Sequence, residues 1–298
     1  MGKVGPKIPN PLIFSEKSGK IPLIMYLGYN TNGLAHHDLF DAVALLAEIG
    51  YRGVAITIDH NALSPNDPNT KQQITRLQKI LKQSEMRSVI ETGARFLLDP
   101  KLKHEPTLLS ESPRRRIDFY KYAVDCAAEL GSDCVSIWSG APPDNVSSQS
   151  AMNQLVEVLH EMLEYAAAQS PKVMIAFEPE PGMFIDSMAM YEKLLAHIDA
   201  PNFRLTLDIG HLQCQGETPI PALVRRWASR LANVHIEDMR RGTHEHLMFG
   251  EGEIDFPPIL QALGESGYAG GVFVELSRHS REAPTAAQKA FEFLRPLV

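Results

Sequence analysis

Residues 203–211 read FRLTLDIGH, and the form of this stretch is the basis for predicting the fold. A short apolar run ends in Asp208, and His211 follows just beyond it. Three other apolar runs in the second half of the chain also end in a residue that can bind a metal: 173–178 in Glu178, 231–235 in His235 and 271–275 in Glu275. Buried carboxylates and imidazoles are costly unless they are paired or bind a metal. The four runs therefore predict buried strands whose ends share a polar site.

Short β-branched runs alternate with longer amphipathic segments from residue 21 to the end of the chain. This alternation predicts strands at 21–27, 53–59, 88–92, 134–138, 173–178, 204–208, 232–236 and 271–275. It predicts helices at 38–49, 72–84, 113–130, 149–168, 188–198, 219–229, 256–266 and 285–294. Repeated βα units of this number indicate an α/β fold, a single (β/α)8 TIM barrel. We expect the barrel domain to span residues 21–298 and residues 1–20 to form an N-terminal arm.

The amino-acid composition limits the kinds of molecule that the protein is expected to bind. The chain has 298 residues and a net charge of -7, so it has no general excess of Lys and Arg for binding nucleic acid. Its three cysteines lack CxxC spacing, which argues against a disulfide framework and favours a reducing cytoplasm. No run approaches the roughly 18 apolar residues that a membrane helix needs. We expect a cytoplasmic protein with a small-molecule substrate and no nucleic-acid or membrane partner; homo-oligomerisation stays open.

The strand ends predict a metal site. In a (β/α)8 barrel the carboxyl ends of all strands converge on one mouth, where active sites are built. Glu178, Asp208, His235 and Glu275 would meet there. Oxygen donors with one imidazole suit Mn, Mg, Co or Zn. The sequence therefore predicts one divalent cation held by these four residues.

The same motifs resemble those of the xylose-isomerase-like TIM-barrel superfamily of sugar isomerases and epimerases. The resemblance is carried by FEP at 177–179, DIGH at 208–211, HIED at 235–238, GEGEID at 250–255 and FVE at 273–275. In ketose 3-epimerase-like members, residues matching Glu178, Asp208, His235 and Glu275 hold one divalent cation. Residues matching His211 and Arg241 bind substrate oxygens. The resemblance implies a metal-dependent enzyme that isomerises or epimerises a ketose or a sugar acid.

The residue types fit this chemistry. A cation that binds a ketone oxygen and the neighbouring hydroxyl acidifies the adjacent carbon by stabilising an enediolate. Glu178 and Glu275 would then remove a proton from one face and return one to the other. Trp138 near the mouth would offer an apolar wall to a sugar. We assign supporting hydrogen bonds or salt bridges to the remaining charged residues at strand ends, Glu91, Arg95 and Glu180.

The loop after His235 departs from the pattern of one-metal epimerases, because it also holds His244 and His246. Abasic-site endonucleases of the same superfamily use such a pair to complete a zinc cluster, and His60 lies where they carry a further histidine. Against this, the fourth predicted strand ends in Trp138 where their pattern has another histidine. A second metal or a substrate contact at His60, His244 and His246 stays open. Multinuclear zinc phosphodiester hydrolysis and metal-assisted dehydration of a keto-polyol are the alternative functions.

Overall fold

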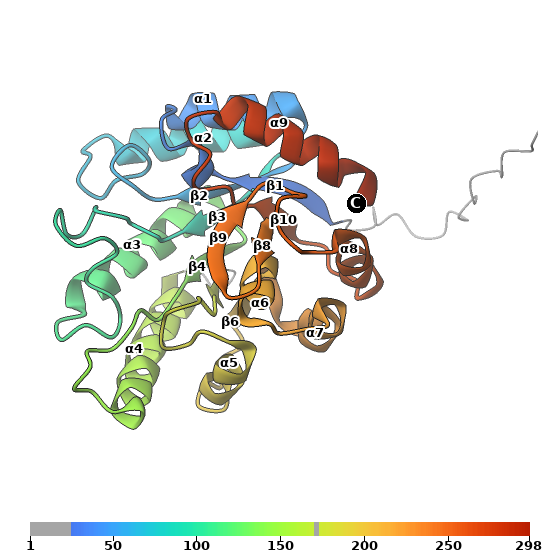
Figure 1. The fold of residues 1–298 in the computed structure, drawn as a ribbon. Coiled ribbons are helices and arrows are strands. Elements are labelled where there is room, and N and C mark those ends of the chain that lie inside the picture. Colours follow the sequence, from blue (N-terminus) through green and yellow to red (C-terminus); the bar gives the residue numbers. More distant parts are fainter. Residues whose placement is uncertain (1–24, 170–172) are drawn as a thin grey trace, which may run out of the picture.

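The computed structural model describes residues 25–169 and 173–298. The predicted N-terminal arm and the start of the first predicted strand lie outside these residues. Eight parallel strands close into a barrel in the order β1-β10-β7-β6-β5-β4-β3-β2 (Figure 1). Their bounds are β1 (Tyr26–Asn30), β2 (Gly53–Thr57), β3 (Arg87–Glu91), β4 (Cys134–Ile137), β5 (Met174–Phe177), β6 (Phe203–Asp208), β7 (Leu231–Ile236) and β10 (Gly271–Val274). The predicted (β/α)8 fold is confirmed.

Helices surround the barrel on the outside (Figure 1). Their bounds are α1 (Leu39–Ile49), α2 (Thr70–Gln83), α3 (Arg114–Leu130), α4 (Ser148–Gln169), α5 (Met188–Leu195), α6 (Ile209–Gln215), α7 (Ile220–Trp227), α8 (Phe256–Glu265) and α9 (Ala283–Leu294). Short 3-10 helices occupy Thr31–Leu34, Ala228–Arg230 and Arg295–Leu297. Asp38, where the first helix was predicted to begin, caps α1, since its carboxylate accepts hydrogen bonds from the backbone N–H groups of Phe40 and Asp41. Among the described residues, no helix has both the length and the apolar character needed to cross a membrane.

Most element bounds lie within a few residues of the prediction, but the first strand was placed wrongly. It continues to Asn30, because Gly28, Tyr29 and Asn30 pair with residues of β2. One α-helix and one hairpin were not predicted. The first is α6, whose seven residues are too few to show a helical apolar period. The second is an antiparallel hairpin of β8 (Asp238–Arg240) and β9 (Thr243–Leu247), which lies in a polar stretch without alternation.

The side chains inside the barrel change character from the bottom to the mouth. A lower layer is apolar and contains Ala55, Val89, Cys134, Ala176 and Phe273. Above it, the Ser136 and Thr206 hydroxyls share a hydrogen bond of 2.9 Å across the interior. Successive inward-facing residues of one strand are two positions apart, so Glu91, Glu178 and Glu275 follow directly above Val89, Ala176 and Phe273. The apolar layer closes the barrel, and the charged layer forms the mouth.

Candidate functional site

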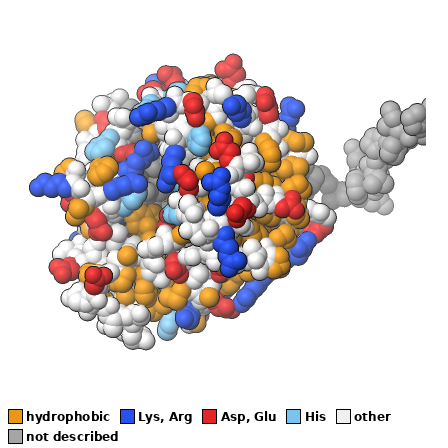
Figure 2. All heavy atoms as spheres, viewed as in Figure 1, with side chains coloured by type: hydrophobic (Ala, Val, Ile, Leu, Met, Phe, Trp, Pro, Cys, Tyr) orange, Lys and Arg blue, Asp and Glu red, His pale blue; other side chains and the backbone are white. Residues whose placement is uncertain are grey.

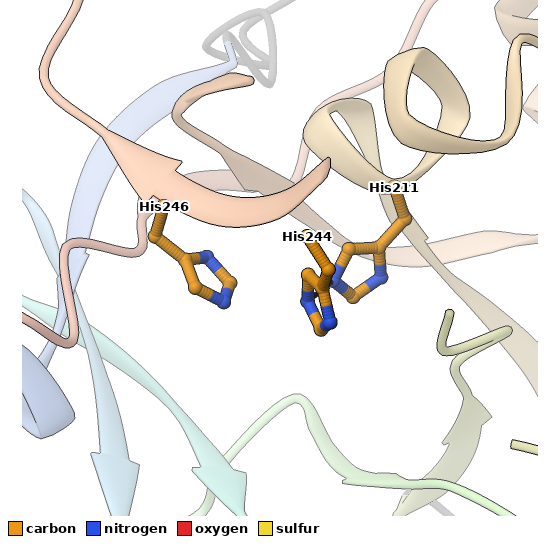
Figure 3. Close-up of side chains that lie close together, drawn as sticks. All are labelled: His211, His244 and His246. Atoms are coloured by element: carbon orange, nitrogen blue, oxygen red, sulfur yellow. Dashed lines mark hydrogen bonds between the residues drawn. The ribbon is translucent and has the colours of Figure 1, made fainter. Parts of the chain in front are cut away.

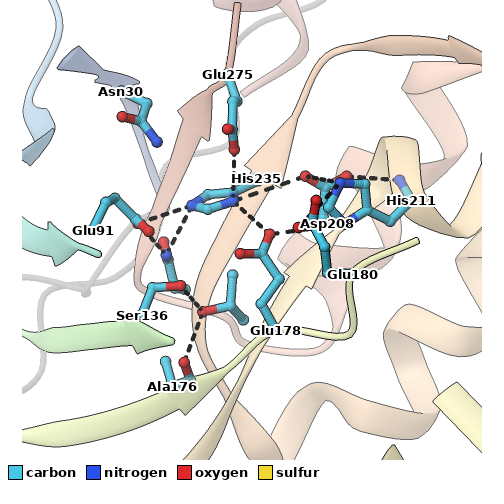
Figure 4. Close-up of polar contacts among 12 residues, drawn as sticks. Asn30, Glu91, Ser136, Ala176, Glu178, Glu180, Asp208, His211, His235 and Glu275 are labelled. Atoms are coloured by element: carbon cyan, nitrogen blue, oxygen red, sulfur yellow. Dashed lines mark hydrogen bonds and ion pairs between the residues drawn. The ribbon is translucent and has the colours of Figure 1, made fainter. Parts of the chain in front are cut away.

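The four predicted metal ligands converge at the carboxyl ends of β5, β6, β7 and β10 (Figure 4). One ligand atom from each of Glu178, Asp208, His235 and Glu275 lies within 4.8 Å of the other three. We call these four residues the carboxylate–histidine site. The side chains of Asp208 and His235 are 0% and 1% exposed, and that of Glu275, the most open of the four, is 15% exposed. The structure thus brings together the whole predicted set.

His235 lies at the centre of this site. Its Nδ1 is 2.9 Å from Glu178 Oε1 and 3.0 Å from Glu275 Oε2. Asp208 Oδ2 lies 3.8 Å from the same nitrogen, and this buried oxygen has no hydrogen-bond partner among the described residues. Three buried carboxylates that face one another repel each other unless a positive charge lies between them. The donor set and the unpartnered Asp208 oxygen therefore fit a divalent cation.

The other side of the His235 ring is fixed from β3. Its Nε2 lies 2.9 Å from Glu91 Oε1, and the Asn233 side-chain amide donates to the same oxygen at 2.9 Å. A proton on Nε2 satisfies Glu91 and leaves the Nδ1 lone pair directed at the three carboxylates. Hydrogen bonds of this kind set the tautomer and orientation of metal-binding histidines. The prediction that Glu91 supports the site through hydrogen bonding is confirmed.

Burial and charge shift the pKa values at this site in opposite directions. Burial raises the pKa of Glu178 to about 8. Burial also acts against ionisation of Glu275, but the charge of His235 and a hydrogen bond from it hold the pKa of Glu275 below its usual range. Burial disfavours a charge on His235, yet Glu91, Glu178 and Glu275 raise the pKa of His235 well above the ordinary value. Without a cation, protons therefore occupy the site near neutral pH.

Binding of a divalent cation at pH 7 is expected to release at least about one proton, because the cation displaces protons from Glu178 and His235. The affinity for the cation should accordingly rise as the pH is raised towards 8, where Glu178 loses its proton in the cation-free protein. Calorimetric titration with Mn²⁺ or Zn²⁺ in buffers of different ionisation enthalpy measures the proton count. Binding without proton release at pH 7 would contradict the assignment of these ligands.

A second cluster lies beside the first. His244 and His246 are two residues apart on β9, so both project from one side of the hairpin towards His211 at the start of α6 (Figure 3). One ring nitrogen of each of the three lies within 4.8 Å of the others. We call His211, His244 and His246 the histidine group. His244 Nε2 lies 3.1 Å from His211 Nε2, and burial followed by repulsion from the other two rings lowers the pKa of His244 to about 4. His244 is thus a neutral imidazole, able to act as a ligand.

Asp208 connects the two clusters. Its Oδ1 accepts a hydrogen bond of 2.7 Å from the backbone N–H of His211, which caps α6, while its Oδ2 belongs to the carboxylate–histidine site. His211 Nδ1 lies 3.2 Å from the Pro179 carbonyl oxygen, a contact that a proton on Nδ1 satisfies. That proton leaves His211 Nε2 as the unprotonated nitrogen, directed at His244. His211 is therefore oriented by β5 and β6 together.

The contacts of Asp238 explain why the motifs HIED and GEGEID occur together. Its carboxylate accepts hydrogen bonds from the backbone N–H groups of Met239, Gly250 and Ile254, which ties the GEGEI segment to the hairpin. Gly252 packs against the same carboxylate, because a Cβ atom there would lie 2.2 Å from Asp238 Oδ1. HIED and GEGEID are therefore halves of one loop structure that holds His244 and His246 over the mouth.

The mouth is a cavity of about 490 Å³ above the carboxylate–histidine site. It is lined by Glu178, His235 and Glu275, by His244 and His246, and by Trp138, whose position agrees with the prediction of an apolar wall. His60 lines a different cavity, of about 180 Å³, beside α1. Arg241 is exposed at the turn of the hairpin and packs against Gly216, so it does not line the mouth cavity. The structure brings neither His60 nor Arg241 to the mouth.

Three polar residues at the site were missed by the sequence analysis. Asn32 donates a hydrogen bond of 2.7 Å to Glu275 Oε1, and Asn233 contacts Glu91 and His235 as described above. Glu237 is fully buried, and its Oε1 lies 3.6 Å from His246 Nδ1. Asn233 could have been predicted, because it lies two residues before His235 and therefore on the same inward-facing side of the strand. Asn32 follows the strand whose end was placed wrongly.

A family model described as a xylose isomerase-like TIM barrel matches residues 43–297. The chain belongs to the xylose isomerase-like TIM-barrel family. Among curated relatives in this family, L-ribulose-5-phosphate 3-epimerase UlaE of Shigella flexneri is 23% identical over 252 residues, which cover 83% of this chain and 84% of the relative. Inosose dehydratase of Lacticaseibacillus casei is 29% identical over 133 residues, or 39% of this chain and 44% of the relative. The chain thus matches less than half of the length of that dehydratase.

Solved structures with the same fold match most of the chain. D-allulose 3-epimerase from Methylomonas sp., in complex with D-allulose, has a TM-score of 0.71 and 19% identity, with coverage of 92% of this chain and 98% of the other. An IolI protein with a bound zinc atom has a TM-score of 0.74 and 21% identity, with the same coverage. At these identities the likeness demonstrates a common fold, and the predicted superfamily is confirmed by the family model.

Proposed function

We propose that the protein is a divalent-cation-dependent isomerase or epimerase of a sugar or a related polyhydroxy ketone. The observation that carries this proposal is the convergence of Glu178, Asp208, His235 and Glu275 within 4.8 Å, three of which, Glu178, His235 and Glu275, line the mouth cavity. The names of the epimerases that this chain resembles in sequence and in fold support the same class of reaction. A cavity of about 490 Å³ is within the usual range for small-molecule sites.

The carboxylate–histidine site holds the cation in this proposal. A divalent cation bound there supplies Lewis acidity, which lowers the pKa of a C–H group next to a carbonyl. Glu178 and Glu275 extend from β5 and β10, which are separated in the barrel by β6 and β7. The two carboxylates therefore approach the centre of the mouth from different sides. One can act on each face of a substrate carbon.

The two carboxylates divide the proton transfers. In one direction, one of these two carboxyl groups would be ionised and remove the proton from carbon, while the other would be protonated and return a proton to the opposite face. Return of the proton to the same carbon gives an epimer, and return to the adjacent carbon gives an isomer. Trp138 closes one wall, and burial of the floor excludes water.

Solvent isotope exchange tests the proposal. A panel of ketoses, keto acids and cyclitols is incubated with the Mn²⁺-loaded protein in D₂O, and each product is analysed by mass and by NMR. We expect deuterium at the carbon next to the carbonyl in at least one epimerised or isomerised product. Loss of water from the product would indicate a dehydratase instead. Absence of carbon exchange across the panel would overturn the proposed enolisation.

The histidine group favours a second candidate, hydrolysis of a phosphodiester with two or more zinc ions. The specific observation is that the nitrogens of His211, His244 and His246 lie within 4.8 Å of one another, next to the carboxylate–histidine site. Trp138 at the end of β4 opposes it, because the nuclease pattern has a histidine there. Elemental analysis separates the two functions. One ion per chain supports the isomerase, whereas two or more zinc ions with phosphodiesterase activity support the hydrolase.

A further inference from the structure

The charges that line the mouth cavity are separated by depth. The carboxylates Glu91 and Glu178 lie at the floor and are buried. The cations that line the same cavity are Arg95, Lys103 and Arg278, and their side chains reach solvent. In Figure 2, blue Lys and Arg side chains lie on this face of the molecule, interspersed with red Asp and Glu side chains. The cavity thus has an acidic floor and a basic rim, in a chain whose net charge is -7.

Two of the rim cations belong to one loop after β3. The backbone N–H of His104 donates to the Arg95 carbonyl oxygen at 2.6 Å, so Lys103 is brought back beside Arg95. Arg116, which is fully buried, donates to the carbonyl oxygens of His104, Pro106 and Thr92 at 2.6, 2.7 and 3.0 Å. Those hydrogen bonds fix the loop from below. The position of Lys103 at the rim is therefore specified by buried contacts.

The same loop adopts an unfavourable backbone conformation. Ala94 and His104 have positive φ values of 51° and 67°, which cost energy for residues other than glycine. An exposed loop that does not position any residue could adopt more favourable φ values. Instead, the buried guanidinium of Arg116 donates hydrogen bonds that hold the loop in this backbone conformation. This arrangement is expected where a loop must present a side chain at a fixed position.

The rim cations are available to a ligand. In the described part of the chain, no carboxylate oxygen lies within 4.0 Å of Lys103 Nζ. Arg278 pairs with Glu245 at 2.7 Å, but both side chains are exposed, and exposed pairs of this kind are weak. Arg95 pairs with Asp59 at 3.2 Å. A ligand anion can therefore bind Lys103 directly and compete for the two arginines.

We propose that Lys103, assisted by Arg95 and Arg278, binds an anionic substituent of the substrate, either a phosphate monoester or a carboxylate. This inference rests on the proposed function, because the reacting carbon would lie at the carboxylate–histidine site. A neutral polyol needs hydrogen-bond partners but no positive charge at the rim. The buried carboxylates at the floor repel an anion, whereas the rim cations attract it, so the charged end of the substrate points outwards. The substrate class is thus a polyhydroxy ketone with a terminal anionic group.

The test compares matched substrates and a matched lysine. The kcat/KM ratio of a ketose phosphate to the same neutral ketose is measured for the wild-type protein, Lys103→Ala and Lys289→Ala. Lys289 is an exposed lysine on α9 and serves as the control. We expect Lys103→Ala to lower the ratio about 10-fold through KM, since one charge-assisted hydrogen bond is lost. The Lys289→Ala ratio should equal that of the wild type. A sugar acid and its neutral parent form the second arm, and the larger preference identifies the anion.

Failure of this inference can be told apart from failure of the proposed function. Equal ratios in the wild type and in Lys103→Ala, with deuterium exchange intact, would overturn only the anion site. If no ketose exchanges deuterium, binding of inorganic phosphate is measured by calorimetry on the Mn²⁺-loaded protein. Weaker phosphate binding by Lys103→Ala than by Lys289→Ala would retain the anion site. Identical binding by both variants, or none in the wild type, would reject it.

Discussion

Glu178→Gln and Glu275→Gln are each expected to lower kcat by about 100-fold to 10,000-fold, the range that general acid–base groups supply. Each variant removes a proton acceptor and one charge from the carboxylate–histidine site. The isosteric amide preserves the volume of each side chain, and Glu178 is already protonated near neutral pH in the cation-free protein. The fold should therefore persist. Steady-state kinetics on the substrate found by isotope exchange, with circular dichroism of each variant, provides the measurement.

Glu265→Gln is the control for these two variants, because Glu265 is an exposed glutamate of α8 whose carboxylate contacts Arg225 and Gln261. Its kcat should equal that of the wild type. If either mouth variant retained full activity while the fold was intact, the division of proton transfers between two carboxylates would be wrong. The two variants also differ in a diagnostic way. Glu178→Gln should release fewer protons on cation binding than the wild type, since Glu178 is the protonated carboxyl.

Glu91→Gln is expected to weaken binding of the divalent cation by about 10-fold to 100-fold, the usual effect of changing a residue that orients a metal ligand. Glu91 makes no direct contact with the cation in our assignment. Its Oε1 accepts a hydrogen bond of 2.9 Å from the N–H group at His235 Nε2. This hydrogen bond keeps the proton on Nε2, so Nδ1 remains unprotonated. Competition between the protein and a chelating dye for Zn²⁺ measures the affinity. An unchanged affinity would mean that the ring is oriented by the carboxylates alone.

Glu192→Gln, at an exposed position on α5, is the control for this experiment and should bind Zn²⁺ like the wild type. The expected loss in Glu91→Gln should be smaller at low pH than at high pH. The Glu91 carboxylate raises the pKa of His235, so His235 of the variant has a lower pKa and protons compete less with the cation as the pH is lowered. An affinity loss that is independent of pH would point to a change in packing.

The fold and the convergence of the four proposed ligands could be predicted because both depend on rules that act within one strand. Each of Glu178, Asp208, His235 and Glu275 ends an apolar run, and the closure of a parallel barrel brings such ends to one mouth. No knowledge of loop conformation was needed. The same holds for Glu91, which ends β3 and faces the same interior.

Residues beyond the strand ends were harder to predict because their positions depend on contacts between distant segments. Arg241 follows His235 closely in sequence, yet the two-residue turn between Arg240 and Thr243 places it at the tip of a hairpin. That hairpin depends on the Asp238 contacts with Gly250 and Ile254. No sequence pattern indicates that Lys103 lies at the rim of the mouth cavity, because hydrogen bonds from Arg116 fix its position. Such hydrogen bonds between side chains and distant backbone have no period in the sequence.

The Asp208 carboxylate has two partners. Its Oδ1 accepts a hydrogen bond from the His211 backbone N–H, and its Oδ2 faces the site of the predicted cation. A cation bound at Oδ2 would withdraw electron density from Oδ1 and weaken it as the acceptor for the His211 N–H. We therefore expect cation binding and the placement of His211 at the start of α6 to be linked, and a substitution of Asp208 to alter both.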